Sequence, residues 1–224
     1  MKPVQVVRRV SAVLSLVMAA SSAFGQGVPV LKKGNFEIGA FGGSTFGSGI
    51  GQLNTQINGR PYATPPSNGA IGTHFGLAAS SHVVVYGEWA YLVGSRAEAN
   101  QDLYLTNGTG SRASVDGHLN AMDVNGGLEY RFQPKKSPKL VPYFLAGVGG
   151  IRSSVDFSQS QIGTTKGSAF TSSIHQTSLV GTAGGGVRFF FTEHAGLRVE
   201  LKGYEGQHSV HFGRLAFGLF YQFR

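Results

Sequence analysis

A repeated aromatic pattern at the ends of three segments most constrains the fold of this chain. The pattern, Gly-aliphatic-x-aromatic-x-Phe, occurs at residues 127–132, 186–191 and 218–223. Because successive side chains of a strand point to opposite faces, each copy places two aromatic rings on one face, one residue apart. Three strands that end in this way predict the aromatic girdle of a transmembrane β-barrel.

One further aromatic pair and one single tyrosine extend the predicted girdle. The outward parity of five predicted strands supplies its members: Trp89, Tyr91, Tyr130, Phe132, Tyr143, Phe189, Phe191, Tyr221 and Phe223. Amphipathic rings at strand ends sit at the level of the lipid headgroups. We therefore expect these side chains to mark the two membrane interfaces.

The N-terminal segment predicts export from the cytoplasm. Lys2, Arg8 and Arg9 precede an apolar run, residues 10–20, which is too short to span a bilayer and is followed by small residues. This order is typical of a secretory signal peptide. We expect residues 1–25 to be cleaved before Gln26 on the general secretory route; the alternative is an uncleaved amphipathic anchor.

The charge content excludes an ordinary soluble domain and a helical membrane protein. Without residues 1–25, 16 Lys and Arg face 11 acids, a net charge of +5. Only 13% of the whole chain is charged, against about 25% in soluble domains. No later segment approaches 18 consecutive apolar residues, so no spanning helix is expected. A β-barrel is the other structure whose backbone hydrogen bonds close internally in lipid.

Period-2 alternation predicts eight strands. They cover about 35–46, 70–79, 83–93, 116–132, 141–153, 177–191, 197–202 and the segment from about 211. Links at 80–82, 134–139 and 192–194 are short, whereas 47–69, 94–115 and 154–176 read as long polar loops. This is the arrangement of an all-β, eight-stranded antiparallel up-and-down transmembrane barrel with extracellular loops. We expect a short periplasmic lead at 26–34 and one barrel domain at 35–224.

The polar parity of the strands predicts a charged lumen. Small residues and a few charges suit the crowded interior of an eight-stranded barrel. We expect the lumen to hold five acids and six bases: Glu37, Glu88, Asp123, Glu129, Arg131, Arg152, Arg188, Arg198, Glu200, Lys202 and Arg214. Buried charges must be paired, so this nearly balanced set predicts an ion-pair network that plugs the barrel. The alternative is a narrow ion path or gate through the network.

One polar cluster near the last long link invites a search for chemistry. Glu205, His208, Ser209 and His211 contain the residue types of a serine hydrolase. Their spacing does not match the His-x-Ser-Asn pattern of lipid A deacylases, and His208 with His211 makes at most half a metal site. We expect no catalytic residue, no bound metal and no cofactor. Export also argues against nucleic acid as a partner.

From about residue 35 to the end, the chain resembles the OmpA-like and opacity-protein-like eight-stranded outer-membrane barrels. The resemblance rests on the architecture and on the last strand, with Tyr221 and Phe223. It implies that Leu219, Tyr221 and Phe223 form the signal read by the barrel assembly machinery, and Arg224 after the last Phe is a departure from the family pattern. It also implies residence in the bacterial outer membrane among its lipids and lipopolysaccharide.

These observations predict a structural or surface-interaction role. We expect a non-enzymatic cell-envelope protein that acts in an adhesion-like way, through long extracellular loops that bind an unknown surface ligand. One alternative is a narrow channel for small solutes or ions. A second is an outer-membrane enzyme that modifies lipid A.

Overall fold

The computed structural model describes residues 31–50, 56–57, 60–61, 69–104, 110–132, 139–162, 170–208 and 210–223. The predicted signal peptide, its cleavage before Gln26 and most of the predicted lead lie outside these residues. In the described part of the chain, no helix is long and apolar enough to cross a membrane.

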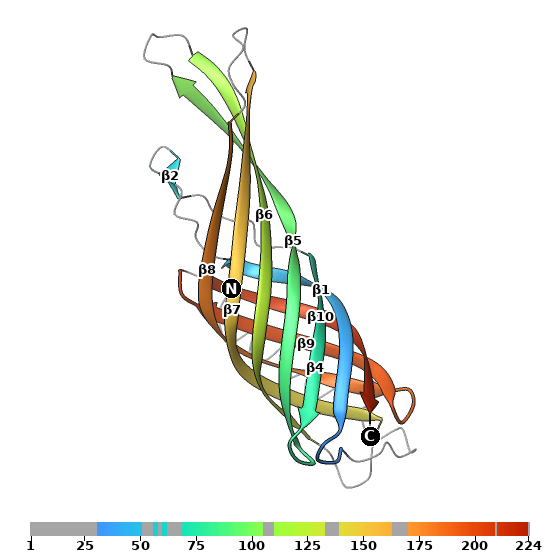
Figure 1. Ribbon diagram of the computed structural model, residues 1–224. Helices are drawn as coiled ribbons and strands as arrows, with labels where there is room; N and C mark the ends of the chain where they lie inside the picture. The colour runs from blue at the N-terminus through green and yellow to red at the C-terminus, as the bar shows by residue number, and fades with distance from the viewer. Residues whose placement is uncertain are drawn as a thin grey trace, which may run out of the picture.

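Eight antiparallel strands close into a barrel, which confirms the predicted fold class (Figure 1). Around the wall they follow the order β1, β10, β9, β8, β7, β6, β5, β4. Their bounds are β1 Phe36–Ile50, β4 Gly69–Ala78, β5 Val83–Tyr104, β6 Gly110–Arg131, β7 Leu140–Ile162, β8 Phe170–Phe190, β9 Ala195–Gly206 and β10 Val210–Phe223. A separate two-stranded sheet pairs β2 (Gln56–Ile57) with β3 (Arg60–Pro61).

Short links gather at one end of the barrel, which we name the turn end. Between β4 and β5, the Ser80 hydroxyl accepts hydrogen bonds from the backbone N–H groups of His82 and Val83. Between β8 and β9, the Thr192 hydroxyl accepts from His194 and Ala195 in the same way. These side chains satisfy backbone donors that no strand pairs, so both turns are tight. The start of β1 and the end of β10 pair at this end too.

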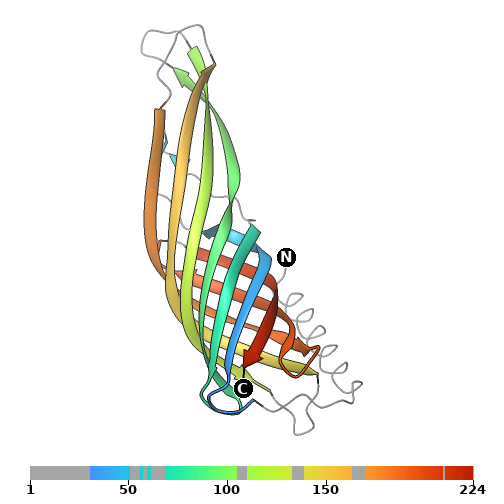
Figure 2. The ribbon, with the colours of Figure 1, turned by 45° about the vertical axis from the view of Figure 1, so that its right-hand side comes forward.

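At the opposite end, four neighbouring strands continue far beyond the other four (Figures 1 and 2). β5 pairs with β6 from Ser95↔Leu119 up to Tyr104↔Gly110, and β7 pairs with β8 from Ser154↔His175 up to Gln159↔Phe170. The sequence-based expectation of long loops at 94–115 and 154–176 was therefore wrong over most of both segments. The backbone ladder continues there with a weaker alternation, in which pairs of charged residues such as Glu98↔Asp116 alternate with pairs of small or apolar residues such as Ala99↔Val115. We name this four-stranded projection, the parts of β5, β6, β7 and β8 beyond the barrel rim, the extension.

Most strands have the predicted facing, but β7 is inverted. Val141, Tyr143, Leu145 and Ile151 are buried in the lumen, whereas Phe144 is exposed on the outer face. Arg152, predicted inside, is exposed outside. The inward side chains of β7 fill space opposite the glycines of β8: a Cβ on Gly186 would collide with the Tyr143 hydroxyl.

Candidate functional site

The lumen of the barrel collects almost all of the predicted inward charges. Ten of the eleven predicted residues are buried there, and Arg152 is the exception. The lumen set is therefore five acids and five bases, without the surplus base that the sequence suggested. The alternation of β1, β5, β6, β8, β9 and β10 puts these side chains on one surface of the wall.

Near the turn end, two glutamates and two arginines form a compact layer. Glu129 accepts two hydrogen bonds from the Arg188 guanidinium, at 3.0 and 3.1 Å, and one from Arg131 Nε at 2.6 Å. Glu37 accepts from Arg131 Nη2 at 3.0 Å and also pairs with Arg188 Nη1. Each carboxylate thus bridges both arginines, and bidentate pairs of this kind are the strong ones.

Arg198 links this layer to the next one. Its Nη2 lies 3.8 Å from Glu129 and forms an ion pair with Glu200. Its Nε donates to the Tyr143 hydroxyl at 2.7 Å, and that hydroxyl donates to Glu200 at 3.0 Å. Tyr143 was predicted for the girdle; the structure shows it inside because its hydroxyl is a member of the ion-pair network.

Toward the extended end, Lys202 and Arg214 hold the remaining acids. Glu88 pairs with Lys202 at 2.9 Å and with Arg214 at 2.7 Å. Arg214 and Lys202 also reach Glu200, at 3.1 and 3.5 Å. Asp123 lies 3.9 Å from Arg214, and the Tyr204 hydroxyl donates to it at 3.0 Å. The network therefore runs without a break through the middle of the lumen.

Aromatic rings pack against the buried cations. Arg188 lies 5.1 Å from the Tyr143 ring centroid and 5.0 Å from that of Phe220. Lys202 sits over Tyr86 at 5.2 Å, and Arg214 sits over Phe41 at 4.5 Å. Desolvated cation–π contacts of this kind each contribute about 2 kcal/mol. Below them Val141, Phe190 and Phe220 form an apolar cluster that closes the turn end.

The predicted lumen set left out four members of the network, of which only Asn125 was expected from the sequence to point inward. His74 is buried beside Glu37, with its Nε2 3.5 Å from the carboxylate and its ring stacked on Tyr86. Asn125 donates to Asp123 and Glu88, and Tyr204 stacks on Phe212. The inward parity of each strand was the available signal, because His74, Tyr86, Asn125 and Tyr204 all share the parity of a lumen charge or of its cross-strand partner.

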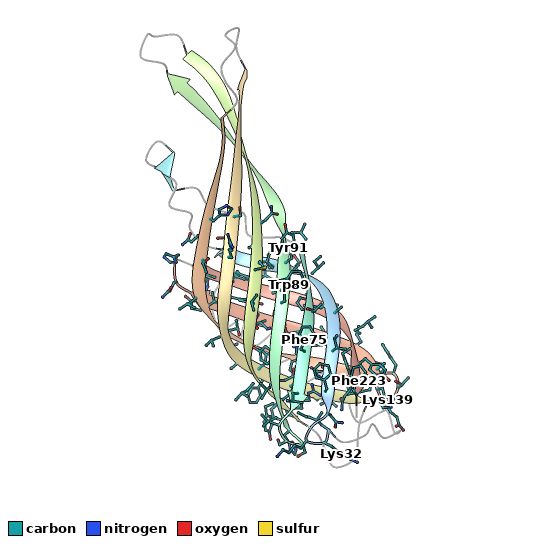
Figure 3. The ribbon with its side chains drawn as sticks, viewed as in Figure 1. Lys32, Phe75, Trp89, Tyr91, Lys139 and Phe223 are labelled. Atoms are coloured by element: carbon teal, nitrogen blue, oxygen red, sulfur yellow. The ribbon has the colours of Figure 1, made fainter. Side chains whose placement is uncertain are left out.

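The outer face carries rings at two levels. Trp89, Tyr130, Phe132, Phe191, Tyr221 and Phe223 are exposed, and Tyr91 and Phe189 are partly exposed. Phe36 and Phe144, which were not predicted, join the level at the turn end through contacts with Phe223 and Tyr130. Figure 3 shows Trp89 and Tyr91 toward the extended end and Phe223 near the turn end. Leu219, the third residue of the predicted assembly signal, is also exposed on β10.

The described side chains of the polar cluster at the β9–β10 link have separate partners. Glu205 pairs with His211 on the exposed outer face, whereas His208 Nδ1 contacts the Ser178 hydroxyl at 3.1 Å. Ser209 lies outside the described residues. Among the residues that the structure describes, no group of three or more His, Asp or Glu side chains could hold a metal ion.

Solved structures of small outer-membrane barrels resemble this fold. Neisserial surface protein A is 15% identical at a TM-score of 0.55, with 85% of this chain and 98% of that chain covered. Ail of Yersinia pestis is 15% identical at 0.48 (85% and 99% covered), and the N-terminal barrel of OprF from Pseudomonas aeruginosa is 15% identical at 0.45 (86% and 100% covered). At such identities the likeness shows the fold alone.

The sequence itself identifies the family. No curated protein matches it closely enough to identify a relative. The family described as "Outer membrane protein beta-barrel domain" matches residues 10–223, which is nearly the whole chain. The closed eight-stranded wall, the outward aromatic rings and the buried charges agree with that match. The chain therefore belongs to the outer membrane protein β-barrel domain family.

Proposed function

We propose that this outer-membrane barrel is a non-enzymatic, non-conducting base that presents the extension to partners outside the cell. One observation carries the proposal: β5–β8 continue as a paired sheet past the barrel rim, whereas β1, β4, β9 and β10 do not accompany them. Short turns face the periplasm in barrels of this kind, and this supports an extension on the outside.

The lumen supports the role of a rigid base. Arg131, Arg188, Arg214 and Lys202 are at most 1% exposed and are paired with buried carboxylates. An eight-stranded barrel has an interior just wide enough for side chains to fill, and here they do fill it. Breaking buried ion pairs strongly destabilises a protein. The barrel wall should therefore resist deformation when a bound partner pulls on the extension.

The extension has features that suit recognition by main-chain pairing. Beyond Val93, β5 pairs only with β6, and before Val180, β8 pairs only with β7, within the described residues. Each outer edge therefore presents backbone N–H and C=O groups. Unpaired edges of this kind accept an extended segment of a partner as an additional strand.

Shortening the extension tests the proposal. Ser95 would be joined to Leu119, and Ser154 to His175, each through an Asn-Gly turn that suits residues directly opposite in the register. We expect unchanged heat-modifiable mobility on gels, and loss of adhesion of expressing cells to epithelial monolayers and matrix-coated wells. Full adhesion by a correctly folded shortened barrel would overturn the surface role.

The orientation has its own test. The chain has no cysteine, so single cysteines can be labelled without background. In intact cells, we expect a membrane-impermeant maleimide to label Asn107→Cys in the β5–β6 connection and to leave Ser81→Cys at the turn end unlabelled. The reverse pattern would contradict the proposed orientation.

A further inference from the structure

The charges of this chain are distributed very unevenly. The lumen is balanced, with five acids and five bases. The segments of the sequence that lead to and from the extended end are also balanced, with five bases and five acids. The bases are Arg60, Arg96, Arg112, Arg152 and Lys166, and the acids are Glu98, Asp102, Asp116, Asp156 and Glu205. In the sequence, the segments that precede β1, connect β6 to β7 and β8 to β9, and follow β10 contain only Glu193 against six bases: Lys32, Lys33, Lys135, Lys136, Lys139 and Arg224. After Gln26, the whole net charge of the chain therefore lies in these last segments.

Lys32 and Lys33 stand on an anchored turn. Leu31 is buried against Ala78 and Val84, and Gly34 N–H donates to the Ala78 carbonyl at 2.8 Å. Asn35 accepts from Lys32 N–H at 2.6 Å and donates to the Phe223 carbonyl at 3.1 Å, which ties the turn to β10. Gly34 has φ +88°, which favours glycine there. Both lysine side chains are exposed.

Lys139 is fixed in a similar way on the other side of the turn end. Its carbonyl accepts from Phe190 N–H at 2.8 Å, and its side chain is partly exposed. Figure 3 shows Lys32 and Lys139 at the same end of the barrel as Phe223. Two imidazoles complete this rim, with His82 stacked on Tyr130 and His194 stacked on Tyr221.

We infer that Lys32, Lys33 and Lys139 form a cationic collar that binds the phosphates of anionic phospholipids in the periplasmic leaflet. The collar lies next to the outward aromatic rings at the turn end, and such rings sit at the level of lipid headgroups. Lysine stems extend along apolar surface while the ammonium reaches the interface. Because Glu193 alone opposes the bases at this end, the net field favours a negatively charged headgroup over a zwitterionic one.

The collar is independent of whatever ligand the extension binds, and it has a direct test in bilayers. The full folded protein would be placed in phosphatidylcholine vesicles that contain spin-labelled phosphatidylglycerol or spin-labelled phosphatidylcholine. Each basic residue near an anionic surface strengthens binding by at most about fivefold. We expect wild type to prefer phosphatidylglycerol several-fold at low salt, and Lys32→Gln/Lys33→Gln/Lys139→Gln to lose most of that preference.

A matched variant removes three bases from the extended end: Arg96→Gln/Arg112→Gln/Lys166→Gln. We expect it to keep the wild-type preference. Arg96 and Arg112 belong to β5 and β6 of the extension, and Lys166 belongs to the connection between β7 and β8, so none of the three is part of the collar. Gel mobility would verify that both variants are folded. No preference in wild type, an unchanged preference in the lysine variant, or an equal loss in the matched variant would each overturn the collar.

Discussion

The two faces of the barrel wall differ sharply along a single strand. On β9, the inward side chains Arg198, Glu200 and Lys202 are buried and ion-paired. The outward side chains alternate with them and are apolar, as is Leu201, which is 48% exposed. In a soluble barrel the apolar side chains would fill the interior and the charges would face water. Here the outside solvent is hydrocarbon, so the interior must accommodate the charges.

This inversion shows what each face requires. The outer face needs no specific partner, because lipid tails are as apolar as its side chains. The inner face needs a partner for every charge, because an unpaired buried charge costs several kcal/mol. The balance of five acids and five bases meets that requirement. Substitutions should therefore have large effects inside wherever they upset the pairing, and outside only where they introduce charge.

The largest effect is expected from Glu129→Gln. The change removes the charge of a fully buried carboxylate that pairs with both Arg131 and Arg188. Breaking a buried pair in this way typically costs about 3 to 5 kcal/mol. Urea unfolding in liposomes would measure the loss.

A matched glutamate on the outside serves as the control for that change. Glu205 is paired with His211, but its side chain is 75% exposed. Glu205→Gln should cost about 0 to 1 kcal/mol, as exposed ion pairs do. Equal losses in the two variants would mean that water screens the lumen charges, and the inside–outside contrast would fail.

A charge placed on the outer face should have the next largest effect. Leu128 lies in the outward row of β6, between Val124, which pairs with Trp89, and the girdle residue Tyr130, and is 57% exposed. Leu128→Arg should destabilise the barrel by about 2 to 4 kcal/mol, the cost of a lipid-facing arginine near the bilayer midplane. Unfolding in liposomes against Leu128→Ala as the uncharged comparison would check it. An unperturbed Leu128→Arg protein would show that this face does not meet lipid.

Two neighbouring residues of β6 test the contrast between the inner and outer faces with smaller expected changes in the free energy of unfolding. Asn125 donates to Glu88 and Asp123 and accepts from Lys202, whereas Val124 points outward. Asn125→Ala leaves buried polar groups without a partner and should cost about 1 to 3 kcal/mol. Val124→Ala should cost less than this, since lipid fills the space. The two unfolding midpoints, measured side by side, decide the order.

The smallest effect is expected from Arg152→Gln. The sequence predicted this residue inside, but the structure places it on the outer face of β7, with an exposed side chain. Its loss should change stability by about 0 to 1 kcal/mol, since charges near the membrane interface cost little. A loss of stability as large as that of Arg188→Gln would mean that Arg152 points into the lumen, and the assigned facing of β7 would then be wrong.

The sequence was informative wherever one parity carried charge. On β6, Asp123, Glu129 and Arg131 separate the inward row from Met122, Val124 and Leu128, so facing and pairing followed from alternation. On β7, residues 140–151 contain no charge, and both parities are apolar. Arg152 was then the only cue, and it misled because it lies at the rim, where a charge is tolerated outside. The tyrosine hydroxyl of Tyr143 finds its partners on other strands, which no local pattern reveals.

The extension escaped prediction for a different reason. In residues 94–104 and 110–119, one parity is charged or polar, whereas the other consists largely of small residues such as Ala97, Ala99 and Ala113, so the alternation is weaker than in the membrane strands. Period-2 alternation reports burial of one face and not the backbone ladder itself. In the register Ser95↔Leu119 through Tyr104↔Gly110, small and apolar residues pair with each other, as in Ala99↔Val115, between pairs of charged residues such as Glu98↔Asp116.

Single-channel recording in planar bilayers tests the central claim, a lumen closed by its ion-pair network, most directly. Wild type should give no conductance steps above the bare membrane, because Arg188, Arg214 and Lys202 are fully buried between carboxylates. Glu129→Gln should lower stability in the parallel unfolding experiment. Reproducible steps in wild type, with a conductance that rises in Glu129→Gln while its stability stays unchanged, would contradict the plug and identify a gated pore.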